Sequence, residues 1–226
     1  MFTHNHEFRD AFETIERLDE EAGRHYDVKG KPLPSVTTVI SHANRKKWAD
    51  WRRRVGEEEA NKISTRASGR GTRVHEIIEK YMNNEEDYRD GYTPDIIQSF
   101  LDVRDILDNR IGTVYAMEAP LYSNHLGVAG RVDCIAEFDG KLSVIDFKTS
   151  MKPKKLDWIK NYFMQESAYA IMWEERTGQQ ITQLVTIISV DDHEPQVFIE
   201  HRDNWVRPLR DTIKQYEEEN STALFV

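Results

Sequence analysis

Residues 127–150 constrain the fold of this chain more than any other stretch. They read GVAGRVDCIAEFDGKLSVIDFKTS and contain two runs in which apolar and polar residues alternate. Alternation with a period of two predicts two half-buried β-strands. Asp139 and Gly140 lie between the runs, and an Asp-Gly pair favours a two-residue type I′ turn. The stretch is therefore predicted to form an antiparallel hairpin.

The turn also determines which residues face each other across the hairpin. If Phe138 pairs with Lys141, the same register places Asp133 directly opposite Asp146, with both side chains on one face of the sheet. Lys148 shares that face, because side chains two residues apart on a strand point the same way. Directly opposed β-carbons lie roughly 5 Å apart. At an effective dielectric constant of about 20, two carboxylates at that separation repel each other by about 3 kcal/mol.

Such a pair of acids is unfavourable unless a positive charge lies between them. A divalent cation would remove the repulsion, and oxygen ligands suit Mg²⁺ or Mn²⁺. The hairpin therefore predicts a metal site with Asp133 and Asp146 as ligands and Lys148 beside it. The alternative is a solvated hairpin end, in which the two acids pair with Arg131 and Lys148.

The composition excludes several classes of protein. Cys134 is the only cysteine among 226 residues, which excludes an intrachain disulfide framework and any four-cysteine zinc or iron–sulfur site. The net charge of −9 gives no general attraction to nucleic acid, although local basic patches can still bind phosphates. The sequence has no apolar run long enough to span a membrane and no signal-peptide core, so we expect an intracellular, cytoplasmic location.

The other patterns predict a single α/β domain over residues 1–226 with a mixed central β-sheet flanked by helices. Apolar spacing and capping residues predict helices over 7–18, 36–42 (capped by Ser35), 45–54, 68–82 (entered through Gly69 and Gly71), from about 93 onward, 156–176 and 204–219. Residues 26–34 predict a strand and turn, and further strands are predicted over 113–122, 183–190 and 196–201. We expect a helical N-terminal part over about 1–110, a sheet core over about 111–201 and a C-terminal helix over about 204–219.

Two segments are rich in basic residues. Residues 45–54, RKKWADWRRR, would grip a phosphate backbone through Arg52 and Arg53 while Trp51 stacks on a base. The alternative is a solvated helix face, and we expect at least one of its two tryptophans in the core. A second basic segment follows the hairpin and contains Lys152, Lys154 and Lys155. It could contact phosphates, although a lysine-rich loop is more often simply solvated.

Three further polar residues are candidates for a site. His75 lies at the edge of the apolar stripe of its helix, where the spacing alone favours a structural histidine over a ligand. Glu118 lies on a strand that we expect beside the hairpin. Gln165 interrupts an otherwise aromatic stripe, and a buried amide needs hydrogen-bond partners. Gln165 is therefore either an edge residue or a contact to the site or its DNA.

Four short motifs occur in one order on these predicted elements. They are Gly71 with His75, then Gly130-Arg131-Val132-Asp133, then Asp146-Phe147-Lys148, and then Gln165 with Tyr169 as QxxxY. Together they resemble the PD-(D/E)XK nuclease superfamily and, within it, the RecB-type exonucleases, including the mitochondrial genome maintenance exonucleases and their phage relatives. The likeness covers about residues 34–173. Val132 replaces the proline of the superfamily motif and Asp146 replaces its glutamate, and both variants fit the RecB branch.

The resemblance implies a role for each matching residue. Asp133 and Asp146 would bind metal, with Lys148 as the catalytic lysine. His75 would be a further metal ligand, which reverses the expectation from spacing, and Phe147 would offer its backbone carbonyl. Gln165 and Tyr169 would support the site and touch DNA. The cysteines that hold an iron–sulfur cluster in some relatives are missing, so we expect no cluster.

The implied fold is restriction-endonuclease-like, and the implied activity is a Mg²⁺- or Mn²⁺-dependent deoxyribonuclease. Asp133, Asp146 and His75 would hold one ion, and a second ion is compatible with Glu118 as an outer ligand. The expected partner is DNA, single-stranded or at ends, in replication, recombination or repair within a bacterial or phage-infected cytoplasm. The alternatives are an inactive DNA-end-binding module of the same fold and a sequence-specific endonuclease.

Overall fold

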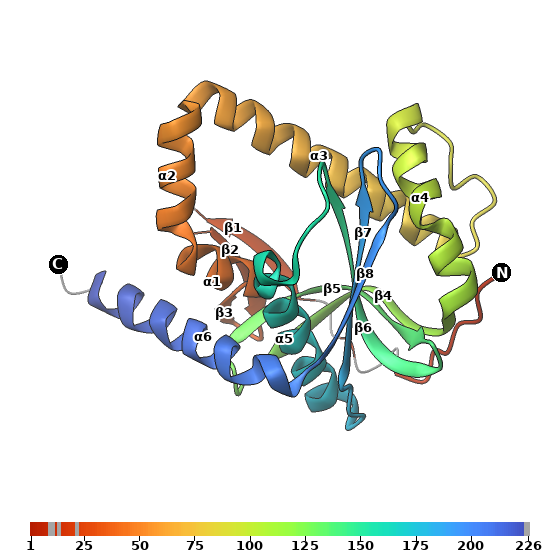
Figure 1. Cartoon of the computed structure of the whole chain (residues 1–226). Helices are drawn as coiled ribbons and strands as arrows, with labels where there is room; N and C mark the ends of the chain where they lie inside the picture. The colour runs from red at the N-terminus through yellow and green to blue at the C-terminus, as the bar shows by residue number, and fades with distance from the viewer. Residues whose placement is uncertain (9–11, 13–14, 21–22, 224–226) are drawn as a thin grey trace.

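A computed structural model describes the whole chain except residues 9–11, 13–14, 21–22 and 224–226 (Figure 1). The central element is a mixed five-stranded sheet. Its strands, in spatial order, are β4 (Ile111–Ser123), β5 (Val128–Phe138), β6 (Lys141–Ser150), β7 (Gln183–Val190) and β8 (Gln196–His201). Neighbouring strands are antiparallel except β6 and β7, which are parallel and are joined through α5 (Lys160–Thr177). The predicted α/β class, with a mixed sheet flanked by helices, is confirmed.

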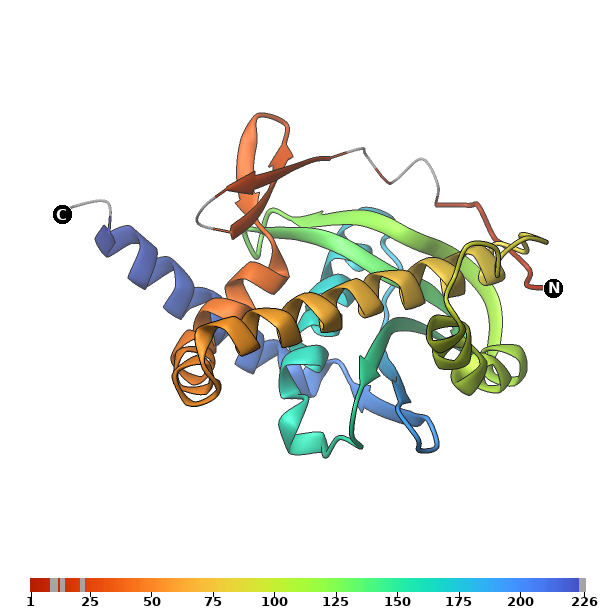
Figure 2. The ribbon, with the colours of Figure 1, turned by 90° about the horizontal axis from the view of Figure 1, so that it is seen from above.

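Helices cover both faces of this sheet (Figures 1 and 2). On one face, α3 (Glu57–Met82) and α4 (Pro94–Arg110) pack against sheet residues such as Ile145 and Phe147. On the other face, α1 (Val36–Ala43), α5 and α6 (Asp203–Ala223) pack against sheet residues such as Ile135 and Val144. Because consecutive strand residues point to opposite faces, β6 contributes to both apolar layers. The buried thiol of Cys134 belongs to the α3–α4 layer.

The N-terminal part, expected to be helical apart from a strand and turn over 26–34, contains a small second sheet around that strand and turn. The sheet consists of β1 (Glu16–Glu20), β2 (Gly23–Val28) and β3 (Lys31–Pro34) in antiparallel order. The predicted helix over 7–18 is wrong in the described residues of that stretch, of which 16–18 belong to β1 and pair antiparallel with β2; residues 9–11 and 13–14 lie outside the described residues. The amphipathic spacing was compatible with a helix, but pairing with a neighbouring strand outweighs such a local preference.

The first two helices lie where the sequence predicts them, whereas the third begins earlier than expected. Ser35 caps α1 as predicted, since its hydroxyl accepts a hydrogen bond from the Thr38 amide. The next helix, α2 (Arg45–Val55), is also where it was predicted. However, α3 already begins at Glu57, so Gly69 and Gly71 lie inside it and do not mark its start. Three glutamates in its first turn favour this earlier start, because they complement the helix dipole.

The tryptophans of α2 also differ from the expectation drawn from the sequence. Trp48 is 56% exposed and Trp51 is partly exposed, so the expectation of a tryptophan in the core is wrong. Their rings contact each other edge-to-face, with centroids 5.7 Å apart. The remaining described helix is a single 3₁₀ turn, η2 (Leu156–Trp158), just before α5. Within the described residues, every helix is too short or too polar to span a lipid bilayer.

Gly130 is needed for close packing between β5 and α5. A β-carbon added to Gly130 would lie 2.8 Å from both a ring carbon (Cε1) and the hydroxyl oxygen of the buried Tyr169 side chain. We therefore expect Gly130→Ala to lower the free energy of unfolding by about 1–3 kcal/mol, because the ring must move. Gly69→Ala is the matched control: its new methyl group meets nothing within 4 Å, and it should stabilise α3 by about 0.5–1 kcal/mol. Urea unfolding of both variants measures the two changes, and a neutral Gly130→Ala would contradict this packing.

Candidate active site

The site is built where the two strands of the central hairpin separate. The turn residues Asp139 and Gly140 have φ values of 52° and 75°, as a type I′ turn requires, and Phe138 pairs with Lys141. The predicted register is therefore confirmed as far as the Cys134–Ile145 pair, and the predicted pairing of Asp133 with Asp146 lies beyond the observed ladder. Counted outward from the turn, pairing between β5 and β6 ends at Cys134 and Ile145, and Asp133 and Asp146 are the next residue on each strand. Beyond that pair, β5 continues beside β4, whereas β6 continues beside β7.

Asp133 occupies the fork between the separating strands. Its Oδ2 accepts a hydrogen bond of 3.0 Å from the Phe147 amide, so a side chain replaces the next backbone contact of the ladder. The carboxylate is held by the backbone of the opposite strand, and its side chain is only 11% exposed. Asp133 and Asp146 thus lie just beyond the last paired residues of β5 and β6, and their backbones do not pair with each other.

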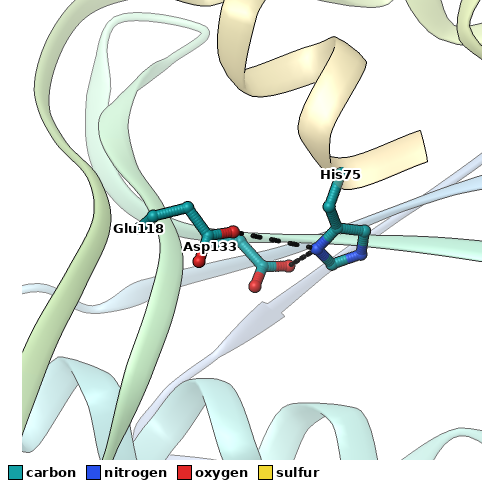
Figure 3. Close-up of side chains that lie close together, drawn as sticks. All are labelled: His75, Glu118 and Asp133. Carbon is teal, nitrogen blue, oxygen red and sulfur yellow. Dashed lines mark ion pairs between the residues drawn. The ribbon is translucent and has the colours of Figure 1, made fainter. Parts of the chain in front are cut away.

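His75 reaches this fork from α3 (Figure 3). Its Nε2 lies 2.6 Å from the Phe147 carbonyl oxygen, which can only accept a hydrogen bond, so Nε2 carries the proton. In a neutral ring, Nδ1 then carries the lone pair. Nδ1 lies 3.5 Å from Asp133 Oδ2 and 4.0 Å from Glu118 Oε1. A lone pair directed at two carboxylates is unfavourable without a positive charge among the three groups.

Glu118 is held beside Asp133 by an unusual backbone conformation. Its neighbours Met117 and Ala119 pair with Cys134 and Val132, so Glu118 faces Asp133 across β4 and β5. Its φ is 45°, a left-handed value inside a strand that costs an ordinary residue roughly 1–2 kcal/mol. Burial, together with the charge of Asp133, raises the pKa of Glu118 to about 7. Backbone strain and a perturbed carboxyl group at one residue are typical of functional sites.

One ligand atom from each of His75, Glu118 and Asp133 lies within 4.8 Å of the others. The three residues come from α3, β4 and β5, so no short sequence motif contains them together. One imidazole nitrogen and two carboxylates form a donor set that a divalent cation such as Mn²⁺ or Mg²⁺ accepts. A cation there would also remove the repulsion among the three groups, so the residues fit a metal ion.

Asp146 lies next to this group but has different partners. Its side chain is almost fully buried; Oδ2 forms an ion pair with the Lys148 ammonium group, and Oδ1 accepts a hydrogen bond of 3.4 Å from Gln165 Nε2. Burial raises the pKa of Asp146, while Lys148 opposes that shift and Asp133 adds to it. Burial alone would lower the pKa of Lys148, but Asp146 and Asp133 together raise it. Lys148 is therefore held as a charged ammonium group.

Gln165 and Tyr169 support Asp146 from α5. Gln165 Nε2 also lies 3.5 Å from the Tyr169 hydroxyl, and the Tyr169 ring rests against Gly130. The amide in the aromatic stripe is explained by these partners, since it lies between the helix and the buried acid. Burial raises the pKa of Tyr169, so its hydroxyl stays protonated.

The predicted DNA-contacting residues lie at different places around the site. Arg131, Lys152 and Lys155 are exposed, whereas Lys154 is partly buried and its backbone bonds Gln196. On α2, Arg52 and Arg53 form ion pairs with Glu57 and Asp50. Every residue of α2 keeps part of its side chain exposed, so both arginines are solvent-facing as well as paired.

Glu166 is a buried acid that the sequence reading missed. It is fully buried, and its Oε1 accepts a hydrogen bond from the Thr186 hydroxyl. Thr186 pairs with Asp146 in the parallel register of β6 and β7. The adjacent residues Gln165 and Glu166 therefore bond neighbouring positions of two strands, which fixes α5 against the site. A usable signal was present, because Glu166 continues the apolar stripe of Phe163, Ala170 and Trp173.

Burial raises the pKa of Glu166 well above its ordinary value. The folded protein then keeps a proton that the unfolded chain releases as the pH rises, so this residue lowers stability progressively at higher pH. We expect Glu166→Gln, which keeps the hydrogen bond to Thr186, to gain thermal stability over the wild type at pH 8 and less at pH 5. Thermal unfolding in EDTA measures the difference, with the exposed Glu59→Gln as control. A difference independent of pH would contradict a buried neutral carboxyl.

Two curated proteins are similar to this chain in sequence. The mitochondrial genome maintenance exonuclease 1 of Homo sapiens is 31% identical over 131 residues, which is 54% of this chain and 38% of that protein. The Xenopus tropicalis protein of the same name is 27% identical over 180 residues, 72% of this chain and 50% of that protein. The chain thus spans half or less of the length of these two relatives.

Two further comparisons concern the fold and the family. A crystal structure of a protein from Eubacterium rectale, provisionally named an exonuclease, shares 13% identity and a TM-score of 0.43 over 66% of this chain and 65% of that chain. The family model of the PD-(D/E)XK nuclease superfamily matches residues 104–223, more than half of the chain, including the fork and α5. The chain belongs to the PD-(D/E)XK nuclease superfamily.

Proposed function

We propose that this chain is a metal-dependent deoxyribonuclease that shortens DNA from its ends, with single strands as its preferred substrate. The observation that carries the proposal is the meeting of His75, Glu118 and Asp133 at the fork, directly beside the Asp146–Lys148 pair. Family membership and relatives named as exonucleases support the same reaction.

The metal ligands that we propose are His75 through Nδ1, Glu118, Asp133 and Asp146. The first three already lie within reach of one another, which supports a direct role for Glu118 beyond the outer position expected from the sequence. The Phe147 carbonyl contacts His75 Nε2, a hydrogen bond of the kind that sets the tautomer and orientation of a ligating histidine. We therefore assign that carbonyl an orienting role in this arrangement.

A bound Mg²⁺ or Mn²⁺ would supply a water of lowered pKa and polarise a phosphate oxygen. The ammonium group of Lys148, kept charged by its pairing with Asp146, would offset the negative charge that develops on the phosphate. We assign Lys148 charge stabilisation, a role that suits an ammonium group ion-paired with Asp146 at the edge of the fork. Gln165 and Tyr169 hold Asp146 in place from α5.

The basic residues around the site would bind the DNA backbone. Arg131 is exposed on β5 two residues from Asp133, and Lys152 is exposed four residues after Lys148. We propose both as phosphate contacts, together with Lys154 and Lys155. Arg52, Arg53 and Trp51 on α2 would contact DNA farther from the fork, where phosphates compete with the acidic partners of the two arginines.

Asp146→Asn tests the catalytic assignment with little change in shape. We expect the rate of digestion of end-labelled single-stranded DNA in Mg²⁺ to fall by at least about 10²-fold. The reason is that Lys148 loses its charged partner and the proposed metal site loses a carboxylate ligand. Thermal unfolding checks the fold, and Asp192→Asn on an exposed turn is the control. EDTA should stop the wild type.

The same assay separates the alternatives. Binding without cleavage by the wild type would indicate an inactive end-binding module, and discrete fragments from plasmid DNA would indicate an endonuclease. Progressive shortening of linear DNA, blocked by protecting one end, is the result expected here.

Glu118 makes metal affinity depend on pH. Below a pKa of about 7 its carboxyl group is protonated, and a cation must displace that proton, so affinity for Mn²⁺ should rise from pH 6 to pH 8. Titration calorimetry measures affinity and counts ions. We expect Glu118→Gln to weaken binding by about 10–100-fold or more and to flatten the pH dependence, whereas the exposed Glu76→Gln should do neither. No saturable binding by the wild type would disprove the metal site.

A further inference from the structure

Residues 151–160, which run from the end of β6 to the first residue of α5, expose large apolar side chains beside the site. They read MKPKKLDWIK. Met151 is 73% exposed, Leu156 is 42% exposed and Trp158 is 62% exposed. Trp158 is the informative member, since a tryptophan offers a wide flat ring that is normally at least half-buried.

The backbone around Trp158 is fixed, so the ring is presented to solvent by a defined structure. The Trp158 amide donates to the Lys155 carbonyl at 2.9 Å in the single turn of η2. On one side, Ile159 is buried in the α5 layer. On the other side, the Lys154 amide and carbonyl both bond the Gln196 side chain, at 2.6 and 3.0 Å. The segment is therefore anchored at both ends of the turn.

This turn lies at the edge of the candidate active site. It follows β6, which carries Asp146 and Lys148, and it precedes Tyr162, whose ring centroid is 5.1 Å from the Lys148 ammonium nitrogen. Trp158 lies one helical turn before Tyr162 in sequence. Figure 1 shows η2 next to the start of α5, below α3, with α2 farther out. The Tyr162 amide donates to the Ile159 carbonyl at 2.8 Å, so the residue after Trp158 is bonded to the residue whose ring contacts Lys148.

Lysines outnumber acids in the segment around Trp158, and its one acid, Asp157, is ion-paired with Lys160, a balance that suits a nucleic-acid strand. Lys155 Nζ lies 5.6 Å from the centre of the Trp158 ring, and Lys152 is exposed on the same segment. Stacking on an aromatic ring requires a base with a free face, which a single strand offers and the interior of a duplex does not. Lysines beside the ring would meet the phosphates of the same strand.

We propose that residues 151–160 form a docking surface for an unpaired nucleotide of the substrate strand. Its base stacks on Trp158, and its flanking phosphates lie near Lys152 and Lys155. This inference rests on the proposed nuclease function. The backbone contacts proposed above are thereby joined by a contact to a base, next to the site.

The test compares three substitutions of Trp158 by fluorescence anisotropy, with labelled single-stranded DNA in EDTA so that no strand is cleaved. Trp158→Ala should weaken binding by about 5- to 150-fold, the range found when a stacking side chain is removed. Trp158→Phe should restore most of the affinity, because it keeps an aromatic face. Trp158→Leu should not, because it keeps only the apolar contact. Ile199→Ala, at another exposed apolar side chain, is the control and should bind like the wild type.

A strand with abasic sites distinguishes stacking from other contacts. Without bases to stack, the wild type and Trp158→Ala should bind it equally. An equal loss on both strands, full rescue by Trp158→Leu, or unchanged binding by Trp158→Ala would each overturn the proposal. Because binding is read without metal or cleavage, a wild type that binds but fails to digest DNA in Mg²⁺ would refute the proposed function separately.

Discussion

The arrangement of the site depends on one hydrogen bond, from the Phe147 amide to the Asp133 carboxylate. In a regular antiparallel ladder this amide would face a backbone carbonyl, and the hairpin would remain closed. Here the ladder ends at Cys134 and Ile145, and a carboxylate fills the opening. The Phe147 carbonyl is used as well, because it accepts from His75. One residue of β6 thus holds both an acid of β5 and a histidine of α3.

Several acids are kept close together in this small volume, and all of those named here except Glu118 have a compensating partner. Asp146 faces Lys148 and Gln165, Glu166 accepts from Thr186, and Asp133 accepts from the Phe147 amide. Glu118 lacks a comparable partner and instead has a raised pKa and a left-handed backbone. An imperfectly compensated acid beside a histidine nitrogen is the arrangement that a bound cation would stabilise. The least stable part of the site is therefore the part to which we assign the metal.

The helix α5 serves as the rigid support of the site. Gln165 and Glu166 bond Asp146 and Thr186, which are register neighbours on β6 and β7, and Tyr169 packs on Gly130 of β5. Three strands are thus tied to one helix at the level of the fork. Because α5 also begins directly after the segment that presents Trp158, the proposed strand-docking surface and the acids share one support.

The sequence by itself determined the features that depend on neighbours along the chain. Turn chemistry at Asp139 and Gly140 set the hairpin and its register, and apolar periodicity located α5 with Gln165 and Tyr169 on it. Residues 16–18 show the limit of that reasoning, because their pairing with β2 outweighs a helical pattern. The exposed tryptophans of α2 show the same limit, since no neighbouring element covers them well enough to bury them.

Only the tertiary structure decided where the hairpin opens and what meets there. The end of the β5–β6 ladder depends on competition from β4 and β7, which join the sheet through contacts distant in sequence. The meeting of His75, Glu118 and Asp133 likewise depends on how α3 packs across the sheet. Local rules describe each strand or helix, but the separations between groups from different elements are set by packing, which no single stretch of sequence contains.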